Sequence, residues 1–92
     1  MRDGADWRNP FLVVYTDGVE VVGIAERVSP DALPAVLAQL PKSAWPYGRV
    51  VGVMECGILP DNHSETMQNE ILAKVLKSLK ELGIEVHLWP SA

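Results

Sequence analysis

The sequence predicts an α/β fold, a two-layer sandwich in the order ββαβαβ, with a four-stranded mixed sheet and two helices on one face. Two observations carry this prediction. Valine-rich runs bounded by glycine, proline and polar residues are typical of short strands, and residues 49–89 read as a strand, a loop, an amphipathic helix, a glycine and a second strand. The 92 residues are expected to form a single domain, 1–92, with 1–10 as an N-terminal tail and 11–89 as the α/β core.

The first two strands are expected to form a hairpin. Phe11–Thr16 is rich in β-branched and aromatic residues, and Val19–Ala25 follows after Asp17-Gly18. Asp-Gly suits a type I′ turn, in which both central residues take positive φ. A seven-residue second strand is therefore predicted.

A short helix is predicted over Ala32–Leu40, with Asp31 as its N-cap. Pro34 lacks a backbone N–H, but this is tolerated in the first helical turn. Pro41 then ends the helix.

The second helix has the clearest signals. Asn62 and Glu65 resemble a capping box. Apolar residues recur at helical spacing over about half the circumference; they are Met67, Ile71, Leu72, Val75, Leu76, Leu79 and Leu82. Gly83 suits the left-handed position that ends a helix, and the alternation over residues 84–88 predicts a half-exposed edge strand.

The expected sheet order follows the chain, 1-2-3-4, with the first strand antiparallel. A weak internal repeat is also present: VVGIAERVSPD, from Val21, aligns with VVGVMECGILPD, from Val50, when one extra residue is allowed. The alignment places Glu26 and Glu55 at equivalent strand ends. If their strands are adjacent, the two carboxylates are neighbours and are candidates for acid–base chemistry; the alternative is a solvated pair with Arg27 as counter-charge.

The strands carry more apolar surface than two helices can cover, because the first three are apolar on both faces. Such strands are normally covered on both sides. We therefore expect a homodimer that packs through the open sheet face or an edge strand; a different protein covering that face is the alternative. Trp7, Tyr15 and Trp89 are the candidate interface residues, since Trp and Tyr are enriched at contact sites.

Composition narrows the partners and the compartment. The net charge of −4 argues against nucleic-acid binding, which needs clustered basic residues, and favours a basic partner surface. The single cysteine cannot form an internal disulfide, and neither a signal peptide nor a membrane-spanning run is recognisable. A cytoplasmic location is expected.

The loop between Glu55 and Glu65 holds the remaining candidate chemistry. Its candidate ligand-binding residues are Cys56, Gly57, Asp61, Asn62 and His63. Cys56 is interpreted as structural, with a reactive thiol as the alternative. His63 could join Cys56 and His87 at a metal, but no ligand spacing supports this, so neither a metal nor another cofactor is expected.

The leading functional hypothesis is a small acidic, non-catalytic binding or regulatory protein that acts as a homodimer. The alternative is a small enzyme or ligand-binding domain that uses the Glu55–Glu65 loop, with Cys56, His63 and the Glu26/Glu55 pair as catalytic candidates.

Overall fold

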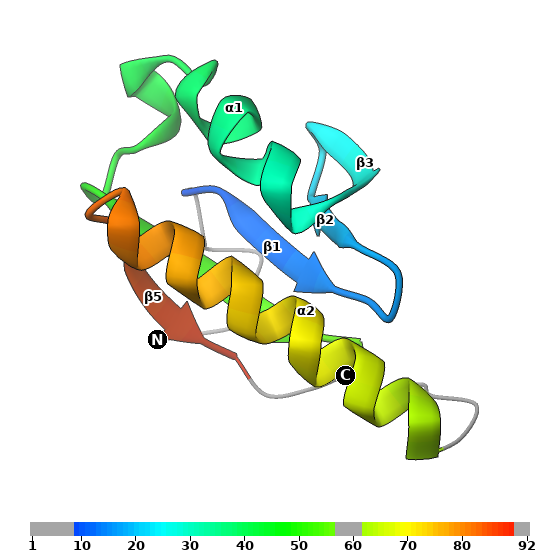
Figure 1. Cartoon of the computed structure of the whole chain (residues 1–92). Helices are drawn as coiled ribbons and strands as arrows, with labels where there is room; N and C mark the ends of the chain where they lie inside the picture. The colour runs from blue at the N-terminus through cyan, green and yellow to red at the C-terminus, as the bar shows by residue number, and fades with distance from the viewer. Residues whose placement is uncertain (1–8, 57–61, 90–92) are drawn as a thin grey trace.

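Five strands and two helices make up the part of the chain that the computed structural model describes, residues 9–56 and 62–89 (Figure 1). In chain order they are β1 (Phe11–Val14), β2 (Val19–Val21), β3 (Ala25–Val28), α1 (Leu33–Ala38), β4 (Val50–Glu55), α2 (Asn62–Glu81) and β5 (Glu85–Leu88). The mixed α/β class is confirmed. The order βββαβαβ corrects the expected ββαβαβ, because a strand was missed between β2 and α1.

The sheet order is β3-β2-β1-β4-β5, not the order of the chain. β1 pairs antiparallel with β2 on one edge and parallel with β4 on the other, while β4 pairs parallel with β5. The expected order placed the second strand beside the strand that follows the first helix. Instead, β1 occupies the centre of the sheet because it offers apolar side chains to both faces.

The predicted hairpin is confirmed, but its turn differs from the expected type. Tyr15 N donates to Gly18 O at 2.8 Å, and among the described residues only Gly23, Gly48 and Gly83 have positive φ. A type I′ turn at Asp17-Gly18 is therefore wrong. Gly18 is needed for space instead, since a Cβ there would lie 2.8 Å from the carbonyl oxygen of Val28 on β3.

The predicted second strand, Val19–Ala25, is two strands joined by a tight reversal. Gly23 has φ +76°, and Ile24 N donates to Val21 O at 2.9 Å. Glycine adopts positive φ without steric cost, so the chain turns back here and continues as β3. Val22 and Ile24 flank the turn and are 47% and 50% exposed.

The first helical segment also starts earlier than predicted. A 3-10 turn covers Pro30–Ala32, and its N-cap is Ser29, whose hydroxyl accepts from Ala32 N at 3.3 Å. The α-helical part, α1, is only six residues long. The expected N-cap Asp31 thus lies inside the 3-10 turn rather than before a helix.

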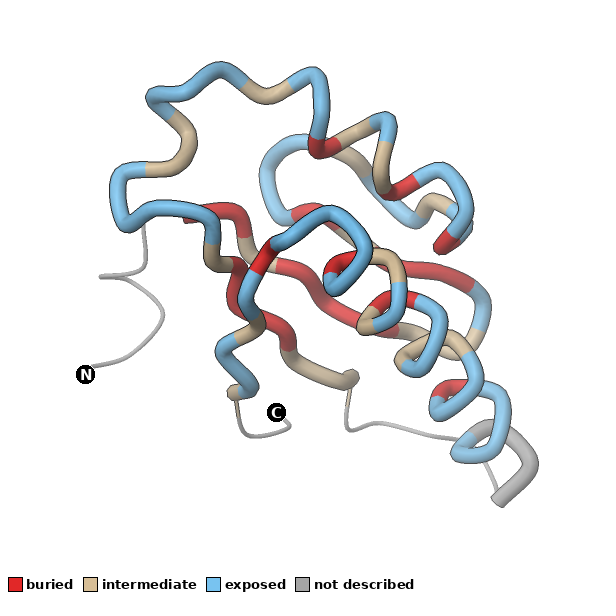
Figure 2. The backbone as a smooth tube through the Cα atoms, turned by 60° about the vertical axis from the view of Figure 1, so that its left-hand side comes forward, coloured by how far each residue is buried: buried red, intermediate tan, exposed pale blue. Residues whose placement is uncertain are grey.

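Both helices pack on the same face of the sheet and share one core with it (Figure 1). The buried core residues are Leu12, Val14, Val19, Val21, Leu33, Leu37, Val51, Val53, Val75, Leu79 and Ile84. Figure 2 shows these buried positions along the central strands and the inward sides of the helices. Gly83 has φ +73° and ends α2 as predicted. Neither helix in the described part has the length and apolarity needed to traverse a membrane.

Candidate functional site

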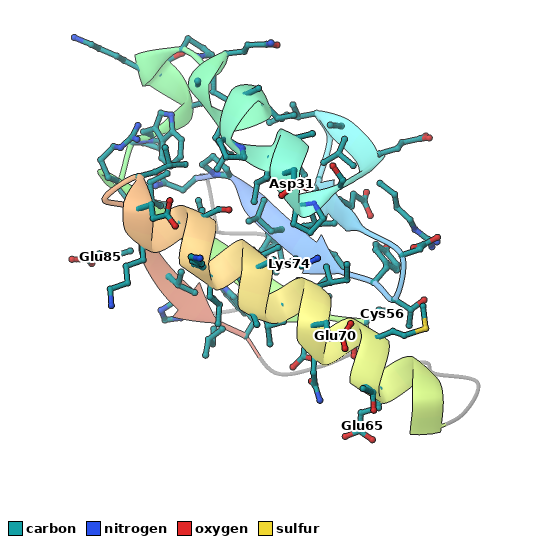
Figure 3. The ribbon with its side chains drawn as sticks, viewed as in Figure 1. Asp31, Cys56, Glu65, Glu70, Lys74 and Glu85 are labelled. Atoms are coloured by element: carbon teal, nitrogen blue, oxygen red, sulfur yellow. The ribbon has the colours of Figure 1, made fainter. Side chains whose placement is uncertain are left out.

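Cys56 lies at the carboxyl end of β4, beside the N-terminal half of α2 (Figure 3). Its backbone N donates to Val14 O at 2.9 Å, and its side chain is half-buried and forms no disulfide. Gly57 and Asp61 lie outside the described residues, as do the side chains of Asn62 and His63, whose backbone begins α2. Of the five predicted ligand-binding residues, Cys56 is therefore the one whose side chain the structure describes.

A buried glutamine that the sequence analysis did not single out organises this end of the sheet. Gln68, on α2, is 3% exposed. Its Nε2 donates to Val14 O at 2.9 Å and to Cys56 O at 2.8 Å. One side-chain amide thus satisfies the last carbonyls of two neighbouring parallel segments and fixes α2 against them. A polar residue on the apolar stripe of the helix is the sequence signal that could have identified it.

The expected Glu26/Glu55 pair does not form. Glu26 is exposed on the outermost strand β3, whereas Glu55 ends β4, with β2 and β1 between them. At ~4.8 Å per strand, three strand spacings separate the two positions by roughly 14 Å. The internal repeat misled here because Val21-Val22-Gly23 is the end of a strand and a turn, while Val50-Val51-Gly52 lies within one strand.

Polar side chains do converge at another place, where β1, β2 and β3 meet. Tyr15 Oη donates to Glu20 Oε1 at 2.9 Å, and the guanidinium of Arg27 lies 3.9 Å from the centre of the Tyr15 ring. Arg27 also forms an ion pair with Asp17, at 3.2 Å to each carboxylate oxygen. Arg27 is thus the counter-charge of Asp17, in the turn, rather than of a glutamate pair.

Tyr15, Glu20 and Arg27 line an open pocket of about 380 Å³, to which Glu26 also contributes. The hydrogen bond to Glu20, with smaller contributions from burial and from the Glu20 charge, raises the pKa of Tyr15 above its ordinary value. The phenol therefore remains a hydrogen-bond donor throughout the neutral range. Three of these side chains are engaged: Tyr15 with Glu20, and Arg27 with Asp17 and the Tyr15 ring.

Aromatic rings cover part of the sheet face opposite the helices. Phe11 and Trp89 meet edge-on with centroids 5.6 Å apart, and His87 lies 5.5 Å from Trp89. Gly52 lies beneath them, since a Cβ there would be 2.8 Å from both Phe11 Cδ1 and Trp89 Nε1. On the same face Val13 is only 8% exposed. The centre of this face is therefore less bare than the sequence suggested.

The three predicted interface residues have different outcomes. Trp7 lies outside the described residues. Tyr15 is half-buried and contacts Glu20 and Arg27 of its own chain. Trp89 is half-buried against Phe11 and His87. Both rings border the open face and make contacts within one chain.

A second buried polar residue, Asn9, fixes the loop before β4. Its Nδ2 donates to Gly48 O at 2.8 Å and Val50 O at 2.6 Å, and its Oδ1 accepts from Tyr47 N at 2.9 Å. The sequence analysis assigned this residue to the tail. Its role is structural, because all three contacts are to backbone.

Within residues 9–56 and 62–89, no group of three or more His, Cys, Asp or Glu side chains is arranged to hold a metal ion. The described residues thus show paired polar side chains near the pocket at β1–β3 and a buried amide at the end of β4. Aromatic rings cover part of the open sheet face, and apolar side chains are exposed at the margins of the sheet.

No protein-family model, curated protein or solved structure matches this chain.

Proposed function

We propose that this chain is a small acidic, non-catalytic binding or regulatory protein that acts as a homodimer. The observation that carries the proposal is the exposure of large apolar side chains at the margins of the sheet. Leu88 on β5 is 64% exposed, and Val22 and Ile24 at the β2–β3 turn are about half exposed. Burial of such side chains against another copy is favourable, at ~25 cal/mol per Å² of apolar area.

The pairing of the polar side chains supports a binding role over a catalytic one. In the pocket at β1–β3, Tyr15 bonds to Glu20, and Arg27 pairs with Asp17 and lies over the Tyr15 ring. At the end of β4, the amide of Gln68 is committed to two backbone carbonyls. Catalytic groups instead need a position about 3 Å from a nucleophile and its base where a substrate atom can sit.

The first test is the mass of the protein in solution across a concentration series from about 1 µM to about 0.5 mM. Interface area does not fix affinity, so the series covers a wide range, and we expect a monomer–dimer equilibrium within it by sedimentation velocity. Circular dichroism at each end of the series controls for folding. A folded monomer over the whole range would overturn the homodimer.

The second test addresses the enzymatic alternative through Cys56. We expect an alkylating reagent to modify Cys56 more slowly in the folded protein than in the urea-unfolded chain, because the side chain is half-buried. Faster modification in the folded protein than in the unfolded chain would contradict a structural cysteine and favour the enzyme.

A further inference from the structure

Two adjoining hollows form one groove at the edge of the sheet opposite β5. The first is the pocket at β1–β3, of about 380 Å³. The second has a volume of about 330 Å³ and is lined by Glu20, Gly23, Ile24, Ala25 and Glu26. Glu20 and Glu26 line both hollows, which are open to solvent. The two hollows together are the β2–β3 groove, and Figure 1 shows these two strands at the end of the sheet order.

Negative charge in the β2–β3 groove is not balanced by positive charge. Among the described lining residues Arg27 is the cation, and it is paired with Asp17. Glu20 accepts the Tyr15 hydroxyl through Oε1. Within residues 9–56 and 62–89, neither its second carboxylate oxygen nor the carboxylate of Glu26 has a hydrogen-bond or ion-pair partner. A cation in the groove would therefore interact with two carboxylates and relieve their mutual repulsion.

Apolar side chains lie beside these carboxylates. Ile24 lines the second hollow and is 50% exposed, and Val22, on the other side of Gly23, is 47% exposed. Burial of such side chains against a partner is favourable. The β2–β3 turn thus presents charge and apolar surface together, within a stretch of a few residues.

The shape of the groove favours a side chain of a larger partner over a free small molecule. Sites for small molecules are usually concave, enclose most of the ligand and have a mainly apolar lining. The β2–β3 groove is open, and its first hollow is lined by charged side chains and one tyrosine. A side chain that projects from another protein needs less enclosure, because its own chain holds it in place.

We propose that the β2–β3 groove binds a basic segment of a partner protein. A lysine or arginine side chain of the segment lies against Glu20 and Glu26, and a neighbouring apolar residue packs on Val22 and Ile24. The net charge of −4 attracts a basic partner over a longer range. This inference rests on the proposed binding role and names the class of partner.

The experiment is fluorescence anisotropy of a short labelled peptide, composed of lysine, leucine and serine, titrated with the full chain. The same peptide with glutamate in place of lysine is the control ligand. We expect the lysine peptide to bind and the glutamate peptide not to bind. Raising the salt from about 0.1 M to about 1 M should weaken the binding, because the charges are exposed to solvent.

Three variants locate the binding site. Glu20→Gln and Glu26→Gln should each weaken binding roughly two- to fivefold, the usual contribution of an exposed charge pair. Glutamine at position 20 still accepts the Tyr15 hydroxyl, so the fold should persist, and circular dichroism checks this. Ile24→Ser should also weaken binding, through the loss of apolar contact. Glu85→Gln is the matched control, since it removes the same charge from exposed β5 at the opposite edge, and it should leave the affinity unchanged.

Three outcomes would overturn the assignment of the groove. Equal losses in Glu26→Gln and Glu85→Gln would mean that the acidic chain attracts the peptide without a site. Spermidine displacing the peptide at the same concentration as the unlabelled peptide would mean that the groove holds a small cation. A homodimer weakened by Glu20→Gln and Glu26→Gln as much as peptide binding is weakened would mean that the groove holds a second copy.

The remaining outcomes separate this inference from the proposed homodimer. A monomer–dimer equilibrium in a protein that binds neither peptide would overturn the groove and leave the homodimer standing. A folded monomer that binds the lysine peptide through Glu20 and Glu26 would overturn the homodimer and support the groove.

Discussion

At the scale of single residues, Gln68 is the most consequential side chain that sequence reasoning missed. The helical spacing predicted the apolar face of α2 correctly. The role of an amide on that face, however, can be assigned only when its hydrogen-bond partners are known. Those partners, Val14 O at the end of β1 and Cys56 O just after β4, are 42 residues apart in the sequence. The pairing of β1 with β4 therefore had to be known first.

Replacing Gln68 by leucine should destabilise the protein by about 1–3 kcal/mol, because two carbonyls lose their donor in a buried environment. Urea unfolding followed by circular dichroism measures the change. Asn69→Ala, at the exposed neighbouring position of the same helix, should cost less than about 0.5 kcal/mol. Equal effects of the two substitutions would contradict the bridging role of Gln68.

The role of Gly52 depends on the limited space beneath the rings of Phe11 and Trp89. Gly52→Ala places a methyl group 2.8 Å from two ring atoms, so Phe11 and Trp89 must move, at a cost of about 1–3 kcal/mol. The cost should shrink in a Phe11→Leu background, where one ring is gone. A double-mutant cycle in urea measures the coupling, and the two substitutions adding independently would show that the rings do not crowd Gly52.

Tyr15 gives a prediction that depends on pH. Its pKa is raised in the folded protein, chiefly by the hydrogen bond to Glu20. The corresponding stability is fully present below the unfolded value of about 10 and is lost as the pH rises through the folded pKa. Glu20→Gln should lower the pKa of Tyr15, measured by phenolate absorbance in a Tyr47→Phe background, so that Tyr15 alone is titrated. An unchanged midpoint would contradict the role of Glu20.

At the scale of elements, the sequence predicted strands and helices well where periodicity was strong, and poorly where a turn lay inside an apolar run. α2 lies between the predicted capping residue Asn62 and the predicted stop Gly83, as expected. The β2–β3 reversal was missed because Val22 and Ile24 continue the valine-rich pattern on both sides of Gly23. This reversal uses positive φ at Gly23, and a lone glycine in a strand pattern is an ambiguous signal of a turn.

The Gly23 turn can be tested by its backbone alone, because a Cβ there would meet nothing within 4 Å. Gly23→Val should destabilise by about 1–2 kcal/mol, since a β-branched residue disfavours φ near +76°. Gly23→Asn should cost less, because asparagine tolerates the left-handed region. Thermal unfolding compares the two variants; equal midpoints would mean that the turn is not held at positive φ.

At the scale of the whole molecule, the sheet order decides which of the predicted sites can exist. Placing β1 at the centre separates Glu26 from Glu55 and gathers Tyr15, Glu20 and Arg27 instead. Local sequence patterns specify strands but not which strands become neighbours. A chain-order sheet and the observed sheet use the same apolar strands, and the difference lies in long-range pairing. The sequence predicted a surplus of apolar surface on the open sheet face. The exposed apolar side chains lie instead at β5 and the β2–β3 turn, a position that depends on the topology.

The charge of the whole chain sets how association should respond to salt. Each copy carries a net charge of −4, so two copies repel each other over the Debye length. Raising the salt from about 0.1 M to about 1 M shortens that length from roughly 10 Å to roughly 3 Å. The proposed dimer should therefore tighten with salt, as measured by sedimentation velocity. A dimer that weakened with salt would mean that attraction between charges, rather than burial of apolar side chains, holds the copies together.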